Sequence, residues 1–514
     1  MAPDPGARPA RNAALVSVGI LASRLVGLVR QRAIGHYLGT TDTADALAAA
    51  FRVGNVIQNL LGEGTLSATI VPIYAKTRRD SPALAARFVR AALGWLLVAV
   101  LTLATLGVIF APTLAALLAP GFEGEKRALM ASLVRILFPM TGILVISAWA
   151  LGVLSAHRRF LLPYAAPVLW SIAQIVAIVI AARAIGLRDA ALATAVAWGA
   201  VAGAGLQLAV MLPAARKLLG SIRPTLEADV PGVRDAATRF PGALLGRGVI
   251  QLSGLVDTYL VSFLGSGAVA SFGFAQTAYL LPMALLGTGE AAAALPDLAE
   301  RDLDAPETKL AMQKSLGASL TRVFALAVGA SAFFAAMGSE VITLLFRGGL
   351  FDQSSTREVA AILFVYAFGL PANAASRIFA TTCFALGDTK RPARFAAIRV
   401  AVSTAISLIA MQRFGVAGVV LGAVTAGWLE LALLANRVRE VLGGTGLAEV
   451  PFAKITLLGV ATAVTGFGLR QLFAPLALNP FLVSSIVLAL AGFVFLATAT
   501  LTRVLNLRAL LRRR

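Results

Sequence analysis

The sequence is dominated by apolar stretches that are long enough to cross a lipid bilayer, which takes about 20 residues of helix. Strands of a membrane barrel would instead alternate apolar and polar residues over about ten positions. The chain is therefore predicted to be an all-α polytopic membrane protein with about 14 transmembrane helices. These spans begin near residues 12, 43, 88, 127, 161, 190, 243, 268, 310, 358, 393, 415, 452 and 479.

The 45 basic residues give a net charge of +20, which could suggest a nucleic-acid partner. Their distribution argues otherwise. With the N-terminus placed in the cytoplasm, 28 of them fall in the inner segments and 8 in the outer loops. Such asymmetry follows the positive-inside rule, so most of the excess sets topology. It predicts an even number of spans and two cytoplasmic termini, and we expect no nucleic-acid partner.

The start of the chain gives no sign of a cleavable signal peptide. The first twelve residues are polar, and the apolar run after them lacks a small-residue cleavage site. That run also carries Arg24 and Arg30, which a cleaved apolar segment would not contain. The first span is therefore expected to remain in the protein.

The second half of the chain echoes the first at an offset of about 225 residues. Leu38-Gly39 precedes Gly62-Glu63-Gly64 and Pro72, and Leu264-Gly265 precedes Gly287-Thr288-Gly289 and Pro296. Parallel repeats are typical of transporters, whose substrate path lies between the halves. We predict a cytoplasmic tail (1–12), a six-helix lobe (13–216), a cytoplasmic linker (217–239), a second six-helix lobe (240–440), and two terminal helices with a basic tail (441–514).

Charged residues inside the first two predicted spans are the main candidates for function. A charge at mid-bilayer costs at least about 2.5–3.5 kcal/mol, so such groups face a bundle interior or a wet cavity. The first span carries Arg24 and Arg30, about 120° apart around the helix. The second carries Asp45, Arg52, Asn55 and Glu63, which helical spacing places on one face.

Two explanations of these charges stay open. Arg24, Arg30, Asp45 and Glu63 could neutralise one another as buried ion pairs, or the surplus arginines could bind an anionic substrate. A guanidinium grips phosphate bidentately and stays charged when dehydrated. The glycine pair at 62 and 64 is expected to let the second span bend or unwind.

The second lobe has its own intramembrane charges. Arg247 and Asp257 lie in the seventh span, and Arg247 is a further candidate for the anion site. Asp257 could take a cation or proton, or could make a hydrogen bond between helices. The only cysteine, Cys383, is expected to be a packing residue, and no metal cluster, Walker A loop or cofactor motif is seen. These features predict a transporter rather than an enzyme.

The chain resembles the MurJ/MviN family, the lipid II flippases of the multidrug/oligosaccharidyl-lipid/polysaccharide exporter superfamily. The residues that carry the resemblance are Ser23–Arg30, Thr43–Ala46, Ala50–Asn55, Gly62–Gly64, Val71-Pro72, Arg159-Phe160 with Pro163 and Pro167, Val256–Ser262, Leu295-Pro296, Leu345–Gly348 and Phe384–Thr389.

This resemblance implies a V-shaped pair of lobes, a central cationic cavity, and alternating access that carries a lipid pyrophosphate sugar across the bacterial inner membrane. Arg24, Arg30 and Asp45 fall on the family's functional positions. Cell wall synthesis proteins are possible partners by the same resemblance, and no cofactor is implied.

The chain departs from the family pattern at several positions. Gln58 replaces an arginine, Gln276-Thr277 replace an Asp-Arg pair, Gly54 replaces a proline, and Ser403 and Ser407 stand where cation-linked Asn or Asp occur. Arg52 and Arg247 could compensate, or the cargo could be a less charged lipid. The alternative function is therefore export of another undecaprenyl-linked polysaccharide. A membrane glycosyltransferase would need an acidic metal motif in a loop, and none is seen.

Overall fold

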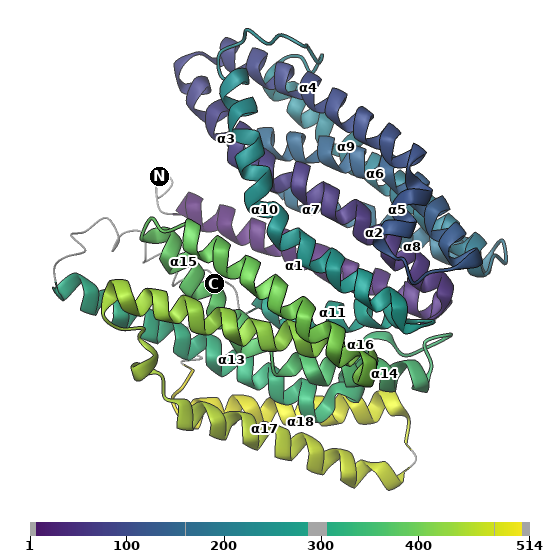
Figure 1. Ribbon diagram of the computed structural model, residues 1–514, viewed down its shortest axis with the longest axis vertical. Coiled ribbons are helices and arrows are strands. Elements are labelled where there is room, and N and C mark those ends of the chain that lie inside the picture. The colour runs from purple at the N-terminus through teal and green to yellow at the C-terminus, as the bar shows by residue number, and fades with distance from the viewer. Residues whose placement is uncertain (1–6, 160, 286–305, 477, 506–514) are drawn as a thin grey trace. The chain divides into compact units, whose positions relative to one another are not determined.

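In the computed structural model of the chain, the described residues are 7–159, 161–285, 306–476 and 478–505, and they are overwhelmingly helical (Figure 1). Each of the fourteen predicted spans coincides with a helix or with part of one. Among the described residues, eight helices are individually long and apolar enough to cross a membrane, and a ninth span results if the bent pair α14 and α15 counts as one. The fold class predicted from the sequence is confirmed.

The chain divides into two compact units, and the first contains the described residues up to Ala270 together with 348–350. Its helices are α1 (Ala7–Leu38), α2 (Asp42–Leu61), α3 (Glu63–Asp80), α4 (Pro82–Ile109), α5 (Ala111–Leu118), α6 (Gly124–Ala156), α7 (Leu161–Ala165), α8 (Pro167–Arg183), α9 (Asp189–Leu219), α10 (Val233–Val261) and the 3-10 turn η1 (Ser262–Leu264).

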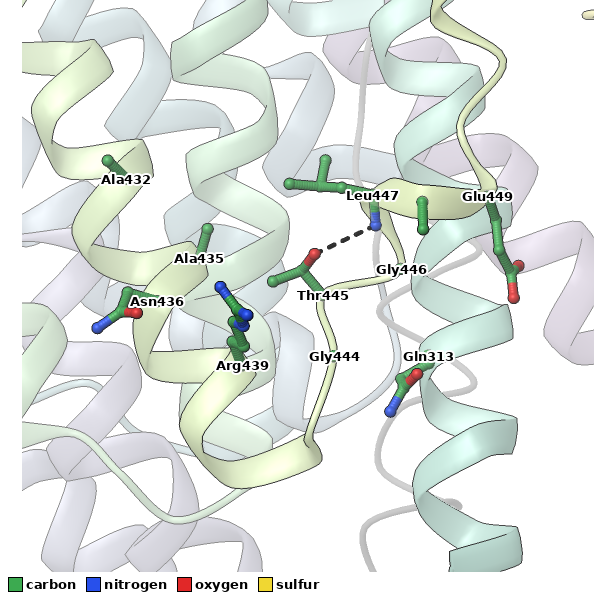
Figure 2. Close-up of a pocket in the computed structure, with 11 residues that line it drawn as sticks. Gln313, Ala432, Ala435, Asn436, Arg439, Gly444, Thr445, Gly446, Leu447 and Glu449 are labelled. Carbon is green, nitrogen blue, oxygen red and sulfur yellow. Dashed lines mark hydrogen bonds between the residues drawn. The ribbon is translucent and has the colours of Figure 1, made fainter.

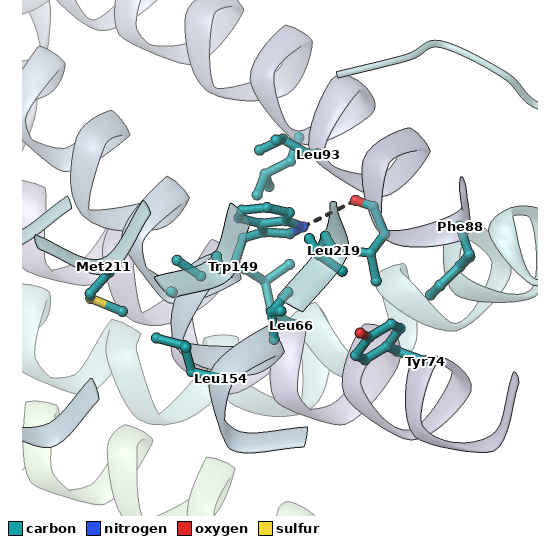
Figure 3. Close-up of a cluster of buried hydrophobic side chains, with 14 of the residues drawn as sticks. Leu66, Tyr74, Phe88, Leu93, Trp149, Leu154, Met211 and Leu219 are labelled. Carbon is teal, nitrogen blue, oxygen red and sulfur yellow. Dashed lines mark hydrogen bonds between the residues drawn. The ribbon is translucent and has the colours of Figure 1, made fainter. Parts of the chain in front are cut away.

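The core of the first unit forms where α3, α4, α6 and α9 meet. Trp149 of α6 lies at its centre with 2% of its surface exposed, and its indole N–H donates to the carbonyl of Val89 at 3.1 Å (Figure 3). Phe88 is fully buried in the same cluster. Because the indole polar atom has a partner, this bulky side chain can be buried without the cost of an unpaired N–H.

The second unit contains 271–347 and 351 onward. Its core joins Phe324, Phe379, Leu434 and Leu458 from four different helices, and Cys383 packs there as a buried apolar residue, as predicted. Helices α17 and α18 pack along α13 (Figure 1). Many of their large apolar side chains are exposed. The helices are α11 (Ala268–Leu285), α13 (Pro306–Phe346), α14 (Gln353–Ala367), α15 (Leu370–Ala385), α16 (Lys390–Leu442), η2 (Leu447–Glu449), α17 (Phe452–Phe473), η3 (Ala474–Leu476) and α18 (Pro480–Leu501).

The eleventh and twelfth spans form one continuous element, α16, that reverses at Gly415. This residue has φ +53° and ψ −133°, a backbone conformation that residues other than glycine rarely adopt. The two halves then pack tightly, since a Cβ at Gly418 would collide with the carbonyl of Ala410. A glycine turn therefore replaces a loop between these two predicted spans.

The predicted domain boundaries remain predictions, and the observed helices begin and end near them as follows. Helix α1 begins at Ala7, inside the predicted tail, and the connection between α9 and α10 is irregular only over residues 220–232. Helix α10, which the repeat assigns to the second lobe, packs on α2 and α3 of the first unit. The repeat turn at 287–289 and Pro296 lie outside the described residues.

Candidate functional site

The charged residues of α1 lie on a helix that is held against α7 and α8. Gly19 permits close contact, because a Cβ there would fall 2.9 Å from the Cβ of Tyr164. Arg24 is exposed, whereas Arg30 is only partly exposed and its guanidinium lies 4.6 Å from the ring centre of Trp170 in α8. The Nε and Nη1 atoms of Arg30 are buried, and neither has a hydrogen-bond partner in the described part of the chain.

Asp45 is completely buried near the start of α2. Its Oδ2 atom lies 2.5 Å from Nζ of Lys126 and accepts from the backbone N–H of Gly267 at 2.8 Å. Its Oδ1 atom accepts from the N–H of Ala270 at 2.7 Å, in the first turn of α11. Both carboxylate oxygens are therefore engaged inside the fold.

Lys126, at the start of α6, is the residue of this cluster that sequence reasoning missed. It also contacts Asp42 at 2.7 Å and the carbonyl of Gly265 at 3.5 Å. Of the two explanations left open, mutual pairing of the span charges does not hold for Asp45, because Lys126 of α6 neutralises it. Spacing within one helix could not reveal a partner 81 residues away.

The two copies of the internal repeat use the same backbone conformation at matching turns. Gly39, between α1 and α2, has φ +60°, and Gly265, before α11, has φ +92°. Both are left-handed conformations that favour glycine. The repeat seen in the sequence at Leu38-Gly39 and Leu264-Gly265 therefore corresponds to two turns that need glycine for the same reason.

Helix α2 carries the next group of predicted site residues. The Nε atom of Arg52 donates to Oγ1 of Thr258 in α10 at 3.3 Å, so Arg52 lies against the seventh predicted span. Asn55 and Gln58 are partly exposed farther along the helix. Asp257, next to Thr258, is also partly exposed. The side chains of Glu63 and Arg247 lie outside the described residues.

The second predicted span breaks at Gly62, as the glycine pair predicted. Helix α2 ends at Leu61, and Gly62 adopts φ −88° and ψ −125° while its N–H donates to Gln58 O at 2.7 Å. A Cβ at this position would collide with that same carbonyl. The helix that carries Arg52 and Asn55 therefore ends before Glu63, which begins α3.

In the second unit, the serines at the cation-linked positions are buried between the halves of α16. The hydroxyl of Ser407 donates to the carbonyl of Val419 at 3.0 Å, and Ser403 lies one turn earlier on the same helix. The carboxylate of Glu430 pairs with Arg399 at 2.8 Å. These groups are thus used in contacts between the two halves of one helical hairpin.

A separate cavity of about 480 Å³ lies in the second unit between the end of α16, the turn that follows, and α13 (Figure 2). Gln313, Asn436, Arg439 and Thr445 supply polar groups to its wall. None of the residues predicted to bind substrate lines it. No sequence pattern indicated this cavity, because its walls come from positions more than 100 residues apart.

Comparison with known families gives a match over most of the chain. The family model described as lipid II flippase MurJ matches residues 34–492. A probable lipid II flippase MurJ of Rhizobium meliloti (strain 1021) is 30% identical over 428 residues, which cover 82% of this chain and 79% of the relative. A lipid II flippase MurJ of Burkholderia cenocepacia is 30% identical over 426 residues, with 82% and 81% covered.

Solved structures show the same fold. A lipid II flippase MurJ in an inward closed conformation matches with a TM-score of 0.77 and 20% identity, covering 95% of this chain and 98% of that chain. An inward-facing multidrug resistance MATE family transporter of the MOP superfamily matches with a TM-score of 0.67 and 16% identity, covering 82% and 94%.

Proposed function

The chain belongs to the MurJ family of lipid II flippases, and from this premise we propose that the arginines of its first unit bind the pyrophosphate of the lipid substrate. Membership makes the protein a transporter of the bacterial inner membrane. It moves lipid II, a lipid-linked peptidoglycan precursor, from the inner to the outer leaflet and so supports cell wall synthesis. The proposed binding groups are Arg24 and Arg30 of α1 with Arg52 and Asn55 of α2.

The observation that carries this proposal is that the Nε and Nη1 atoms of Arg30 are buried without a hydrogen-bond partner among the described residues. A buried arginine with a purely structural role would be expected to hold a carboxylate, because an unpaired buried charge is expensive. Asp45, the candidate acid in α2, is already held by Lys126 and two backbone N–H groups. The donors of Arg30 therefore remain available to a phosphate, which a guanidinium binds bidentately.

Arg52 and Arg247 are proposed to replace the charges that Gln58, Gln276 and Thr277 lack. The contact of Arg52 with Thr258 supports this, because it brings the guanidinium of α2 to α10, the helix that also carries Arg247. The proposed substrate groups thus belong to three helices of one unit. Glu63, just after the break in α2, is retained as a candidate on the resemblance alone.

Ion coupling and topology complete the proposal. Asp257 is the proposed group for cation or proton coupling, although Ser403 and Ser407 provide no charge at the positions linked to it in the family. Both termini are proposed to be cytoplasmic, on the distribution of basic residues. Proteins of cell wall synthesis are proposed partners.

The test is depletion of the protein in its host, followed by analysis of the lipid-linked precursors of each leaflet. Accumulation of lipid II on the inner leaflet is expected, and plasmid-borne Arg24→Ala and Arg30→Ala proteins should be made normally but fail to restore transport. Arg188→Ala, an exposed arginine at the start of α9, is the matched control and should restore it. Accumulation of a different undecaprenyl-linked glycan would instead identify a polysaccharide exporter.

A further inference from the structure

Trp170, in the first turn of α8, is fixed on several sides. Its carbonyl accepts from the side-chain amide of Gln174 at 3.1 Å, and its ring meets Phe51 of α2 edge to face at 6.2 Å. Helix α9 approaches so closely that a Cβ at Gly203 would fall 2.8 Å from the Cα of Trp170. The contacts with Gln174 and Gly203 thus hold the backbone of Trp170, and the ring contact with Phe51 orients its indole.

The face of this indole receives the guanidinium of Arg30 at 4.6 Å. The negative face of an aromatic ring attracts a cation, and tryptophan does so best. A carboxylate would neutralise the charge and also occupy its N–H groups. The ring attracts the guanidinium without accepting hydrogen bonds from it. The Nε and Nη1 atoms therefore have no partner in the part of the chain that the structure describes.

We propose that Trp170 is the positioning residue of the substrate site, holding the Arg30 guanidinium in place while leaving its donors free for the substrate pyrophosphate. The inference rests on the proposed function of Arg30. Because Arg30 is partly exposed, a small shift of its side chain brings the guanidinium N–H groups to an anion at the surface of this unit. The indole Nε1, also buried and unpaired among the described residues, is a second donor that such a shift could expose.

The competing explanation is that Trp170 only fills space between α1, α2 and α8. Both explanations predict that a small residue at this position harms the protein. They differ in whether the effect depends on Arg30 and on the electron density of the ring, because packing depends on neither.

The first experiment measures the binding of purified lipid II to purified full-length variants. Trp170→Leu is expected to weaken binding about 3- to 30-fold, the range that a cation–π contact corresponds to, and Trp170→Phe by less. Trp198→Leu, an exposed tryptophan of α9, is the matched control and should bind as wild type. In an Arg30→Gln background, Trp170→Leu should add nothing. An equal loss in both backgrounds would overturn the proposal in favour of packing.

The second experiment keeps the shape of the side chain, so a failure to fold cannot obscure the result. Fluorinated tryptophans draw electron density from the ring and weaken its attraction for a cation. Their incorporation at all five tryptophans should weaken lipid II binding stepwise with the number of fluorines, and Trp170→Phe protein should show no such series. An unchanged affinity across the series in wild type would overturn the positioning role.

The same measurements separate this inference from the proposed function. If Arg30→Gln weakens lipid II binding but neither Trp170 substitution nor fluorination does, only the role of Trp170 is lost. If Arg30→Gln binds lipid II as tightly as wild type, the proposed substrate site is wrong and the inference fails with it.

Discussion

Replacing Asp45 by asparagine tests the polar cluster between α2, α6 and the turn before α11. The substitution keeps the size of the side chain and removes its charge. Among the described residues it leaves Lys126, whose side chain is 12% exposed, with only the exposed Asp42 as a carboxylate partner. It also turns one acceptor into an N–H₂ group, so either Gly267 or Ala270 loses its hydrogen bond.

The expected destabilisation follows from these losses. Breaking a buried ion pair by removing one partner costs about 3–5 kcal/mol, and a buried backbone N–H without an acceptor costs about 1–3 kcal/mol. The two figures overlap, because both include the desolvation of the groups left behind. We therefore expect Asp45→Asn to lower the free energy of unfolding by about 3–5 kcal/mol, a large share of the roughly 5–15 kcal/mol available to a typical domain.

Denaturant titration of the purified protein in detergent, followed by tryptophan fluorescence, measures this loss. Asp42→Asn is the matched control, because Asp42 contacts the same lysine at 2.7 Å but its side chain is 58% exposed. An exposed ion pair contributes about 0–1 kcal/mol, so the control should unfold almost as wild type. Equal midpoints for Asp45→Asn and wild type would refute the role assigned to the buried contacts.

Three other outcomes are expected. Reporter fusions after Arg216 and at the C-terminus should both read cytoplasmic, and an external reading at either would reject the topology. Arg52→Gln should reduce lipid II transport far more than Gln58→Ala does, as measured by complementation of a depleted strain. Burial, together with the charges of Arg78 and Arg159, lowers the pKa of His157 below its ordinary 6.5. The unfolded chain then binds the proton more readily, so the unfolding temperature should fall as pH drops through about 6.5, and His157→Gln should flatten this dependence.

The architecture was predictable because apolar length and charge asymmetry are properties of consecutive residues. The same holds for the break at Gly62, which the glycine pair of the second predicted span indicated. The left-handed turn at Gly415 was not predicted, since the sequence indicated only that a new span begins near this residue. The helices and the break at Gly62 depend on local sequence, and the structure confirms them. The topology that the charge asymmetry predicts stays a prediction.

The partners of the charged residues were not predictable in this way. Asp45 and Lys126 meet because α2 and α6 pack together, and the backbone donors of Gly267 and Ala270 arrive from more than 200 residues away. Trp170 gave no signal, because an aromatic residue in an apolar span is consistent with a lipid-facing position. Only the packing of α1 on α8 places it under Arg30.

The packing of α10 on α2 and α3 has a consequence for the order of events during synthesis. Translation delivers residues at about 5–20 per second, and domains generally fold as units beginning from the N-terminus. The first unit extends to Ala270, so its early helices must wait for α10, the helix that is made directly after the sixth span. Until α10 is inserted, the surfaces of α2 and α3 that receive it stay uncovered in the membrane, where an insertion chaperone or a neighbouring chain could occupy them.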